Sequence, residues 1–368
     1  MNLLSIIGKI ILHIILLPVK ILVSVLFNFL YLPSVKFDSN IYYTTPTVDV
    51  NKRAEEIKNS LNINAYINDG DGAKFLGLAY TSCKDKRLWD EVSTLLYGLS
   101  YILRVPWSEN YDQKVFSGDM WAGMFPAILT ALENNHMSNW HKKQVLSIIE
   151  NTIFNGKSFV FKHPIDDDQD RGFIFPFWSM GSNFFDVISM CLIAEKLNGG
   201  VKYKVLRYIF TIIGFPLMFF LRQGIFIKDV YALNFFTEHS ALVKAYYVYK
   251  FCGYKFLKRP IVRHCEDNPW FLDSAKFLQD LTGNSSYDMF LNDYLNTTNL
   301  ENIENIPWTF KHTYFSLKGF EKKDTYSLYS LPYRFRMGSK YLDDDKPMEP
   351  KGEKKLQSTA DFIHFYNW

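Results

Sequence analysis

The residues best placed to do chemistry lie in the segment FSGDMWAGMFPAIL, residues 116–129. A Ser-Gly-Asp turn followed by apolar residues at helical spacing predicts a helix that begins near Asp119. The helix dipole favours negative charge at that position, and Trp121 lies within one turn of it. Gly118 and Gly123 leave room beside the carboxylate for a ligand. Asp119 is therefore a candidate acid/base residue, with a helix cap and nothing more as the alternative.

The arrangement Ser-x-Asp-x-x-x-Gly-Met at residues 117–124 stands at the head of one in a series of long predicted helices. It resembles the (α/α) toroid enzymes, which include six-hairpin glycoside hydrolases and polysaccharide lyases. The resemblance covers residues 55–285 in the rhythm of the helices, with about eight predicted helices, fewer than a full six-hairpin barrel has. It implies a barrel of helical hairpins in which Asp119 is the first carboxylate of a central funnel.

A glycosidase needs a second carboxyl group, because one group protonates the leaving oxygen while the other acts as base or nucleophile. The candidates are Asp186, Glu238 and Asp267. Glu238 is preferred because it stands beside His239 near the start of an otherwise apolar helix, where a charged residue has either a partner or a task. We expect Glu238 to be the catalytic partner of Asp119, and His239 and Asp186 to contact substrate. A capping or surface role for Glu238 is the alternative.

A second cluster of polar residues lies in HPIDDDQDRGFIFPFW, residues 163–178. Three of its acids alternate along the chain: Asp166, Asp168 and Asp170. This spacing can wrap a calcium ion, but the carboxylate of a complete calcium loop is missing, so a solvated acidic loop and no cofactor are the favoured interpretation. Arg171 stands between acids and aromatics, where it could hold an acidic sugar or a phosphate. With Trp178 and Trp121 it is a candidate substrate-binding residue.

The charge balance and the missing motifs exclude several classes of protein. Forty-one Lys and Arg residues against 38 Asp and Glu leave a net charge of +3, which argues against nucleic acid as a partner. The four cysteines form no CxxC pair, and the histidines never fall at metal-ligand spacing. The GxSxG elbow, the Walker loop, GxGxxG after a strand and HExxH are all absent from the sequence.

The first 33 residues form a membrane-associated element, because they are overwhelmingly apolar. Their polar residues recur at helical spacing and predict one narrow stripe: Asn2, Ser5, Lys9, His13, Lys20, Ser24 and Asn28. Such a helix suits the headgroup boundary, with its lysines reaching lipid phosphates. A membrane-spanning helix is the next alternative, and a signal peptide or a core helix is less favoured.

A second apolar run, Ile209–Leu221, is too short to span a membrane and is flanked by cations. It predicts either a buried core helix or a segment that dips into the same leaflet as the first 33 residues.

The rest of the chain predicts a mostly α-helical protein. Residues 34–50 form a polar linker, residues 51–299 a helical domain of (α/α) type, and residues 300–368 an aromatic-rich extension of short strands or ordered coil that packs on the body. The predicted helices are Ala73–Cys83, Leu88–Leu103, Asp119–Glu133, Asn139–Phe154, Ser182–Leu197, Lys202–Leu221, Val230–Phe251 and Pro269–Leu281.

These features together favour a membrane-attached enzyme that acts on a glycan or glycolipid by carboxylate acid/base chemistry, as a glycosidase or a lyase. Membrane lipids and the glycan substrate are the expected partners. Two alternatives remain: a membrane-associated scaffold or binding protein without catalysis, and an enzyme whose substrate is the lipid itself.

Overall fold

The structure is a computed structural model, and it is mostly helical with one long apolar helix at the N-terminus. It describes residues 3–30, 49–59, 72–105, 116–154, 159–163, 171–172, 181–219, 235–267, 272–284, 287–288, 291 and 360–368. The predicted linker and most of the predicted C-terminal extension lie outside these residues.

Helices supply nearly all of the described architecture. In chain order they are α1 (Leu3–Leu30), α2 (Val50–Asn59), α3 (Gly72–Cys83), α4 (Lys86–Ser93), α5 (Gly118–Glu133), α6 (Asn139–Phe154), α7 (Gly181–Lys196), α8 (Val201–Met218), α10 (Phe235–Cys252), the short η3 (Lys255–Leu257), α11 (Lys258–Asp267), α12 (Leu272–Thr282) and α15 (Ala360–Phe365). Two antiparallel pairs of short strands join them in the described part: β1 (Leu96–Tyr97) with β2 (Tyr101–Ile102), and β3 (Val160–Phe161) with β4 (Arg171–Gly172).

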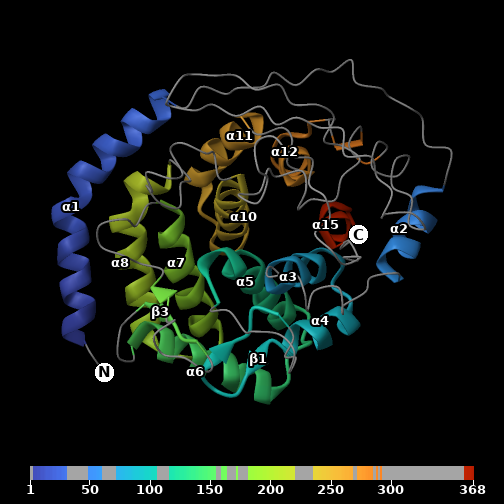
Figure 1. The fold of residues 1–368 in the computed structure, drawn as a ribbon, viewed down its shortest axis with the longest axis horizontal. Helices are drawn as coiled ribbons and strands as arrows, with labels where there is room; N and C mark the ends of the chain where they lie inside the picture. The colour runs from blue at the N-terminus through green and yellow to red at the C-terminus, as the bar shows by residue number, and fades with distance from the viewer. Residues whose placement is uncertain are drawn as a thin grey trace, which may run out of the picture.

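The helices form an inner set and an outer set (Figure 1). Each inner helix packs on the next in the sequence of contacts α3–α5–α7–α10–α11–α12–α15, and α15 returns to α3. The remaining helices lie outside this set: α4 packs on α3, α6 and α8 on α7, α2 on α15, and α1 on α8. Segments far apart in the sequence are thereby neighbours, above all the last helix and α3.

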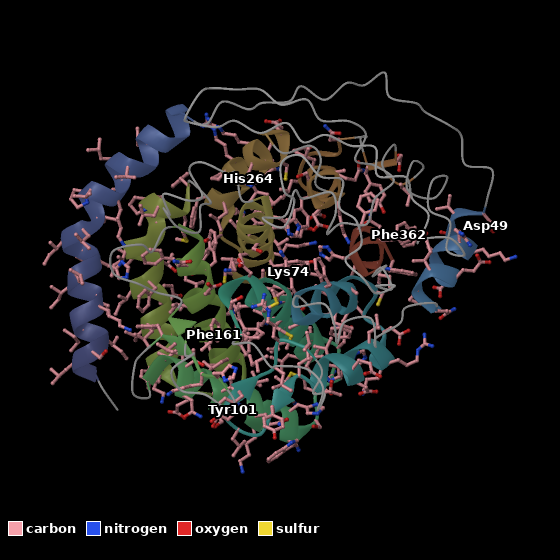
Figure 2. The ribbon with its side chains drawn as sticks, in the orientation of Figure 1. Asp49, Lys74, Tyr101, Phe161, His264 and Phe362 are labelled. Carbon is pink, nitrogen blue, oxygen red and sulfur yellow. The ribbon has the colours of Figure 1, made fainter. Side chains whose placement is uncertain are left out.

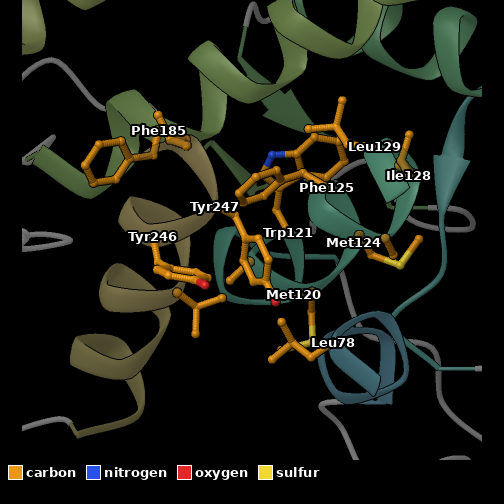
Figure 3. Close-up of a cluster of buried hydrophobic side chains, with 14 of the residues drawn as sticks. Leu78, Met120, Trp121, Met124, Phe125, Ile128, Leu129, Phe185, Tyr246 and Tyr247 are labelled. Carbon is orange, nitrogen blue, oxygen red and sulfur yellow. The ribbon is translucent and has the colours of Figure 1, made fainter. Parts of the chain in front are cut away.

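Large aromatic and sulfur-containing side chains fill the space between α3, α5 and α10 (Figure 3). The Phe125 ring meets the Tyr247 ring edge to face, with centroids 6.4 Å apart. Tyr246 stacks on Phe277 of α12 at 3.7 Å. The high aromatic content of the sequence is thus used in the core, where such ring pairs add to the free energy of burial.

Two glycines let α3 and α5 approach each other at backbone distance. A Cβ atom at Gly123 would lie 2.6 Å from the Cα atom of Lys74, and one at Gly77 would lie 2.6 Å from the carbonyl carbon of Gly123. Both distances are too short for any side chain. This close crossing places the Lys74 backbone against Gly123, which lies one turn beyond Asp119 on α5.

We expect Gly123→Ala to lower the free energy of unfolding by about 1–3 kcal/mol, because the added methyl group forces the α3 and α5 backbones apart. Urea unfolding followed by circular dichroism measures the change. Gly8→Ala is the matched control, since Gly8 is also helical but has open space beside it. Its substitution is expected to be neutral or slightly stabilising, and equal losses from both variants would contradict the proposed close crossing.

The predicted helix Leu88–Leu103 is wrong beyond Ser93. The helix ends there and the chain turns into the β1–β2 hairpin, with Gly98 at φ +59°. The side-chain amide of Gln144 in α6 donates to the carbonyls of Leu96 and Gly98, at 3.1 and 2.9 Å. The hairpin therefore depends on a contact with α6, which helical periodicity cannot reveal.

The expected orientation of the N-terminal helix is also wrong. Its polar stripe faces the protein: His13 and Lys20 are 1% and 4% exposed and lie 3.0 Å apart, Nδ1 to Nζ, and Lys9 lies over the Phe159 ring. The His13 ring contacts Phe184 of α7 at 5.4 Å. A stripe of polar residues can face either lipid headgroups or polar and aromatic partners, and here the body supplies the partners.

The last residues of the chain pack on the body. Residues 362–366 are buried, and α15 lies against α3 and α12. Lys276 of α12 donates to the carbonyls of His364 and Tyr366, and Ser82 of α3 donates to the same two carbonyls. This segment is a helix, where the sequence predicts strand or ordered coil for the extension.

Candidate functional site

Polar and charged side chains gather inside the molecule, most of them in the first two turns of the inner helices. They come from six helices: Lys74 of α3, Asp119 of α5, Ser182 and Asp186 of α7, His239 and Ser240 of α10, Asp273 of α12, and His364 of α15. In Figure 2 Lys74 lies close to the middle of the molecule. Burying a polar group costs free energy unless it is hydrogen-bonded or ion-paired, so most of these side chains are expected to have partners inside the protein.

Asp119 stands in the first turn of α5, which begins at Gly118 directly after the extended residue Ser117. The Ser117 hydroxyl makes no capping bond, although its carbonyl accepts the first helical hydrogen bond from Trp121 at 3.0 Å. Asp119 is partly exposed, and within the described part of the chain its buried Oδ1 atom has no hydrogen-bond partner. Asp119 therefore has both access to solvent and an unused acceptor.

Asp186 forms a fully buried ion pair with Lys244 of α10. The Lys244 Nζ atom lies 2.8 Å from Oδ1 and 3.0 Å from Oδ2, and both side chains are 0% exposed. Burial raises the pKa of Asp186 to about 7; Lys244 opposes this rise, and the charge of Asp119 adds to it. Asp119 and Asp186 are therefore close enough to influence each other, but Asp186 is not open to a substrate.

A chain of hydrogen bonds joins α10, α12 and α15. The distances are 2.6 Å from His239 Nε2 to Asp273 Oδ2, 2.7 Å from His364 Nδ1 to Asp273 Oδ1, and 2.7 Å from Tyr247 Oη to His364 Nε2. Burial lowers the pKa of both histidines, so both are neutral near pH 7. One proton arrangement satisfies all three bonds: each histidine donates to Asp273, and Tyr247 donates to His364.

Lys74 connects this region to α5. Its Nζ atom donates to the Ser240 hydroxyl at 2.7 Å, and both residues are 0% exposed. Ser240 follows His239 directly, while the Lys74 backbone touches α5 at Gly123. One lysine thus brings the starts of α3, α5 and α10 together.

The other predicted site residues fall in different places. Trp121 is 1% exposed, and its indole N–H donates to Ser189 at 2.8 Å, so we assign it to the core and not to a subsite. His239 and Asp186 are likewise interior groups with partners. Glu238 lies in the first turns of α10, but its side chain is outside the described part, as is that of Arg171. Trp178 and the three alternating acids, residues 166, 168 and 170, lie outside it altogether.

No group of His, Cys, Asp or Glu residues in the described part has the arrangement of a metal site.

Reasoning from sequence missed most of the interior polar groups. The clearest signal was a lone lysine in an apolar helical run, as in GAKFLGLAY for Lys74 and SALVKAYYV for Lys244. Such a lysine stands on the face that periodicity assigns to the core, so it needs a buried partner. Asp273 and His364 carried no comparable signal, because their partners are distant in the sequence.

Comparison of the chain with protein-family models, curated proteins and solved structures found no match.

Proposed function

We propose that the chain is a membrane-attached enzyme with an (α/α) toroid-like body, which acts on a glycan or glycolipid by carboxylate acid/base chemistry. The circuit of inner helices from α3 through α7 to α15, with other helices outside it, supports the toroid-like arrangement. The apolar helix α1 supports membrane attachment, since its segment Leu4–Val23 has the length and composition to cross a bilayer.

The observation that carries the proposal is the state of Asp119. The other two interior acids already have partners: Asp186 pairs with Lys244, and Asp273 contacts His239 and His364. Of these three acids Asp119 is the one that is partly exposed. Its buried Oδ1 atom has neither a hydrogen bond nor an ion pair in the described part of the chain, whereas the Oδ1 atoms of Asp186 and Asp273 lie 2.8 and 2.7 Å from a lysine and a histidine nitrogen. A carboxylate in this state can take or give a proton at a substrate oxygen. The buried pair of Asp186 and Lys244 would fix the charge behind it.

Glu238 remains our proposed second carboxylate. It directly precedes His239 and Ser240, and Ser240 is tied through Lys74 to α3 at the crossing with α5. The start of α10 therefore belongs to the same region of the molecule as the start of α5. Two carboxyl groups on neighbouring helices fit the chemistry of glycoside cleavage.

A scaffold without catalysis is the second candidate, because much of the polar interior is paired. Lys74, Lys244 and Tyr247 each bond to another buried side chain. A network of this kind can serve only to fix one packing of the helices.

We expect Asp119→Asn and Glu238→Gln each to lower kcat/KM by about 10²–10⁴ on whichever member of a glycan and glycolipid panel the wild type cleaves. Product release measures turnover, and circular dichroism verifies folding. Asp85→Asn is the control, because Asp85 caps the outer helix α4 through the Arg87 N–H. Full activity in Asp119→Asn would remove this residue from the chemistry, and a wild type that cleaves nothing in the panel would favour the scaffold.

A further inference from the structure

Exposed large hydrophobic side chains of the described residues are concentrated on two helices. On α1 they are Leu4, Ile7, Ile11, Leu12, Ile14, Ile15, Val19 and Leu22. On α8 and the residue after it they are Val201, Val205, Tyr208, Ile212, Phe215 and Phe219. Apolar side chains gathered in this way mark a surface that contacts something other than water.

The exposed residues of α8 follow one another at intervals of four and three, so they occupy a single face of the helix. The opposite face is buried in the body through Tyr203, Phe210 and Leu217, which are 1%, 0% and 1% exposed. The helix α8 is thus apolar on both faces, whereas a helix at a water-facing surface usually has one apolar face toward the core and one polar face toward water. Ile212, at 73% exposed, shows how open the outer face is.

The outer helix α1 packs directly on α8, as Figure 1 shows at the edge of the molecule. Its inner face is buried, with Ile6 at 1% exposed, and its outer face carries the apolar residues. The exposed apolar residues therefore belong to two neighbouring helices at one edge of the molecule.

The two helices that carry this region contain basic residues and no acidic ones. Neither residues 3–30 nor residues 201–219 contain an acidic residue. The exposed cations of these helices are Lys202 and Lys204 at the start of α8, whereas Lys9 and Lys20 face the body and Arg207 pairs with Glu195. A bilayer with anionic headgroups offers hydrocarbon to the apolar side chains and phosphates to the cations. A second copy of the chain would instead bring like charges together.

We propose that α1 and α8 form one membrane-contacting surface, and that the body lies with this surface along the bilayer. The helix α1 does not cross the membrane in this arrangement. Its inner face is packed on the body, so a crossing would carry neighbouring charged groups into hydrocarbon, among them the half-exposed pair of Lys202 and Glu150. Placing such charges inside a bilayer is costly.

The end of α8 also contacts the start of α7, the helix that carries Asp186. The first residue of α7, Gly181, packs against the backbone of Leu217 and Met218 at the end of α8, at 3.0 Å from its Cβ position to the Met218 Cα atom. Phe215 and Phe219 add an aromatic edge there, with ring centroids 5.1 Å apart. The start of α7, five residues before Asp186, therefore lies beside the end of α8. Membrane contact does not depend on the proposed catalysis and is tested apart from it.

The test is flotation of the purified full chain with phosphatidylcholine–phosphatidylglycerol vesicles, which measures a partition coefficient. The test variant replaces Val201, Val205 and Ile212 of α8 with Ser. The control variant replaces three exposed apolar residues elsewhere with Ser: Tyr97, Leu99 and Trp140. We expect the α8 variant to bind vesicles about tenfold more weakly or worse, and the control to bind like the wild type.

Two results would overturn the proposal. If the α8 variant and the wild type bind equally well, α1 alone contacts the membrane. If the substitutions in α8 leave vesicle binding intact but convert a dimer into a monomer in sedimentation, a second copy covers this face. Turnover is not measured in either case, so an inactive enzyme leaves the result unaffected.

Discussion

Lys244→Met is expected to lower the free energy of unfolding by about 3–5 kcal/mol, because it leaves Asp186 buried without a cation. The loss is expected to increase with pH. Without Lys244 the pKa of Asp186 in the folded protein rises further above its value in the unfolded chain, which is about 3.9. The folded state then holds the proton more tightly than the unfolded state, so stability is greatest at low pH and declines as pH rises toward the folded pKa. Urea unfolding at several pH values measures both effects.

Two controls separate the buried pair from a general effect of losing a lysine. Lys250→Met changes the same helix, but Lys250 pairs with Asp280 at 3.3 Å with both side chains nearly half exposed, so a loss below about 1 kcal/mol is expected. The double variant Asp186→Leu with Lys244→Met removes both charges and should recover most of the stability. A single variant as stable as the double variant at high pH would show that Asp186 carries no buried charge.

The regular part of the fold could be predicted from the sequence. Apolar residues at intervals of three and four predict α3, α5, α6 and α7 almost to their ends, because each of these helices is buried on a broad face. The same reasoning failed for the β1–β2 hairpin, where Leu96 pairs with Ile102. The bonds from Gln144 that hold this hairpin join segments 48 and 46 residues apart, and local spacing carries no trace of them.

The sequence pointed to three of the interior polar groups, Asp119, Asp186 and His239, but only Asp119 carried a local signal for its position in the fold. A Ser-Gly-Asp turn before an apolar run is a local signal, and the residue indeed stands in the first turn of a helix. The partners of Asp186 and Lys74 are 58 and 166 residues away, on helices whose packing no local pattern specifies. The prediction that Trp121 binds substrate is not supported for a related reason. An aromatic residue near a carboxylate is equally typical of a sugar subsite and of a hydrophobic core.

The sequence also could not predict which face of the amphipathic helix α1 packs on the protein. The spacing of Lys9, His13 and Lys20 correctly places them on one face of α1. Spacing does not reveal whether that face contacts lipid headgroups or the rest of the protein. Only the packing of α1 on α8 decides it. The apolar outer face follows from that packing, and with it the extension of the membrane-contacting surface to α8.

Removal of residues 360–368 is expected to abolish cooperative folding. The segment carries four side chains that are at most 1% exposed: Phe362, Ile363, His364 and Phe365. Burial of each large apolar side chain contributes about 1.5–3 kcal/mol to stability. The three apolar side chains together therefore contribute an amount comparable to the whole free energy of unfolding of a domain, which is about 5–15 kcal/mol. The deletion also leaves Asp273 without His364 and leaves Lys276 without its acceptors. Thermal unfolding by circular dichroism measures the loss of the transition.

Shorter changes locate the effect within the segment. Removal of Asn367 and Trp368 alone takes away exposed residues and is expected to keep a cooperative transition, since the carbonyl group of Tyr366 stays within reach of Lys276. His364→Ala keeps the helix but removes the hydrogen bonds to Asp273 and Tyr247, so an intermediate loss is expected. The nine residues given back as a synthetic peptide should restore part of the transition by binding the folded state. A truncated chain that unfolds at the wild-type midpoint would show that α3 does not need α15, and the polar network across α10, α12 and α15 would then have no part in holding the inner helices together.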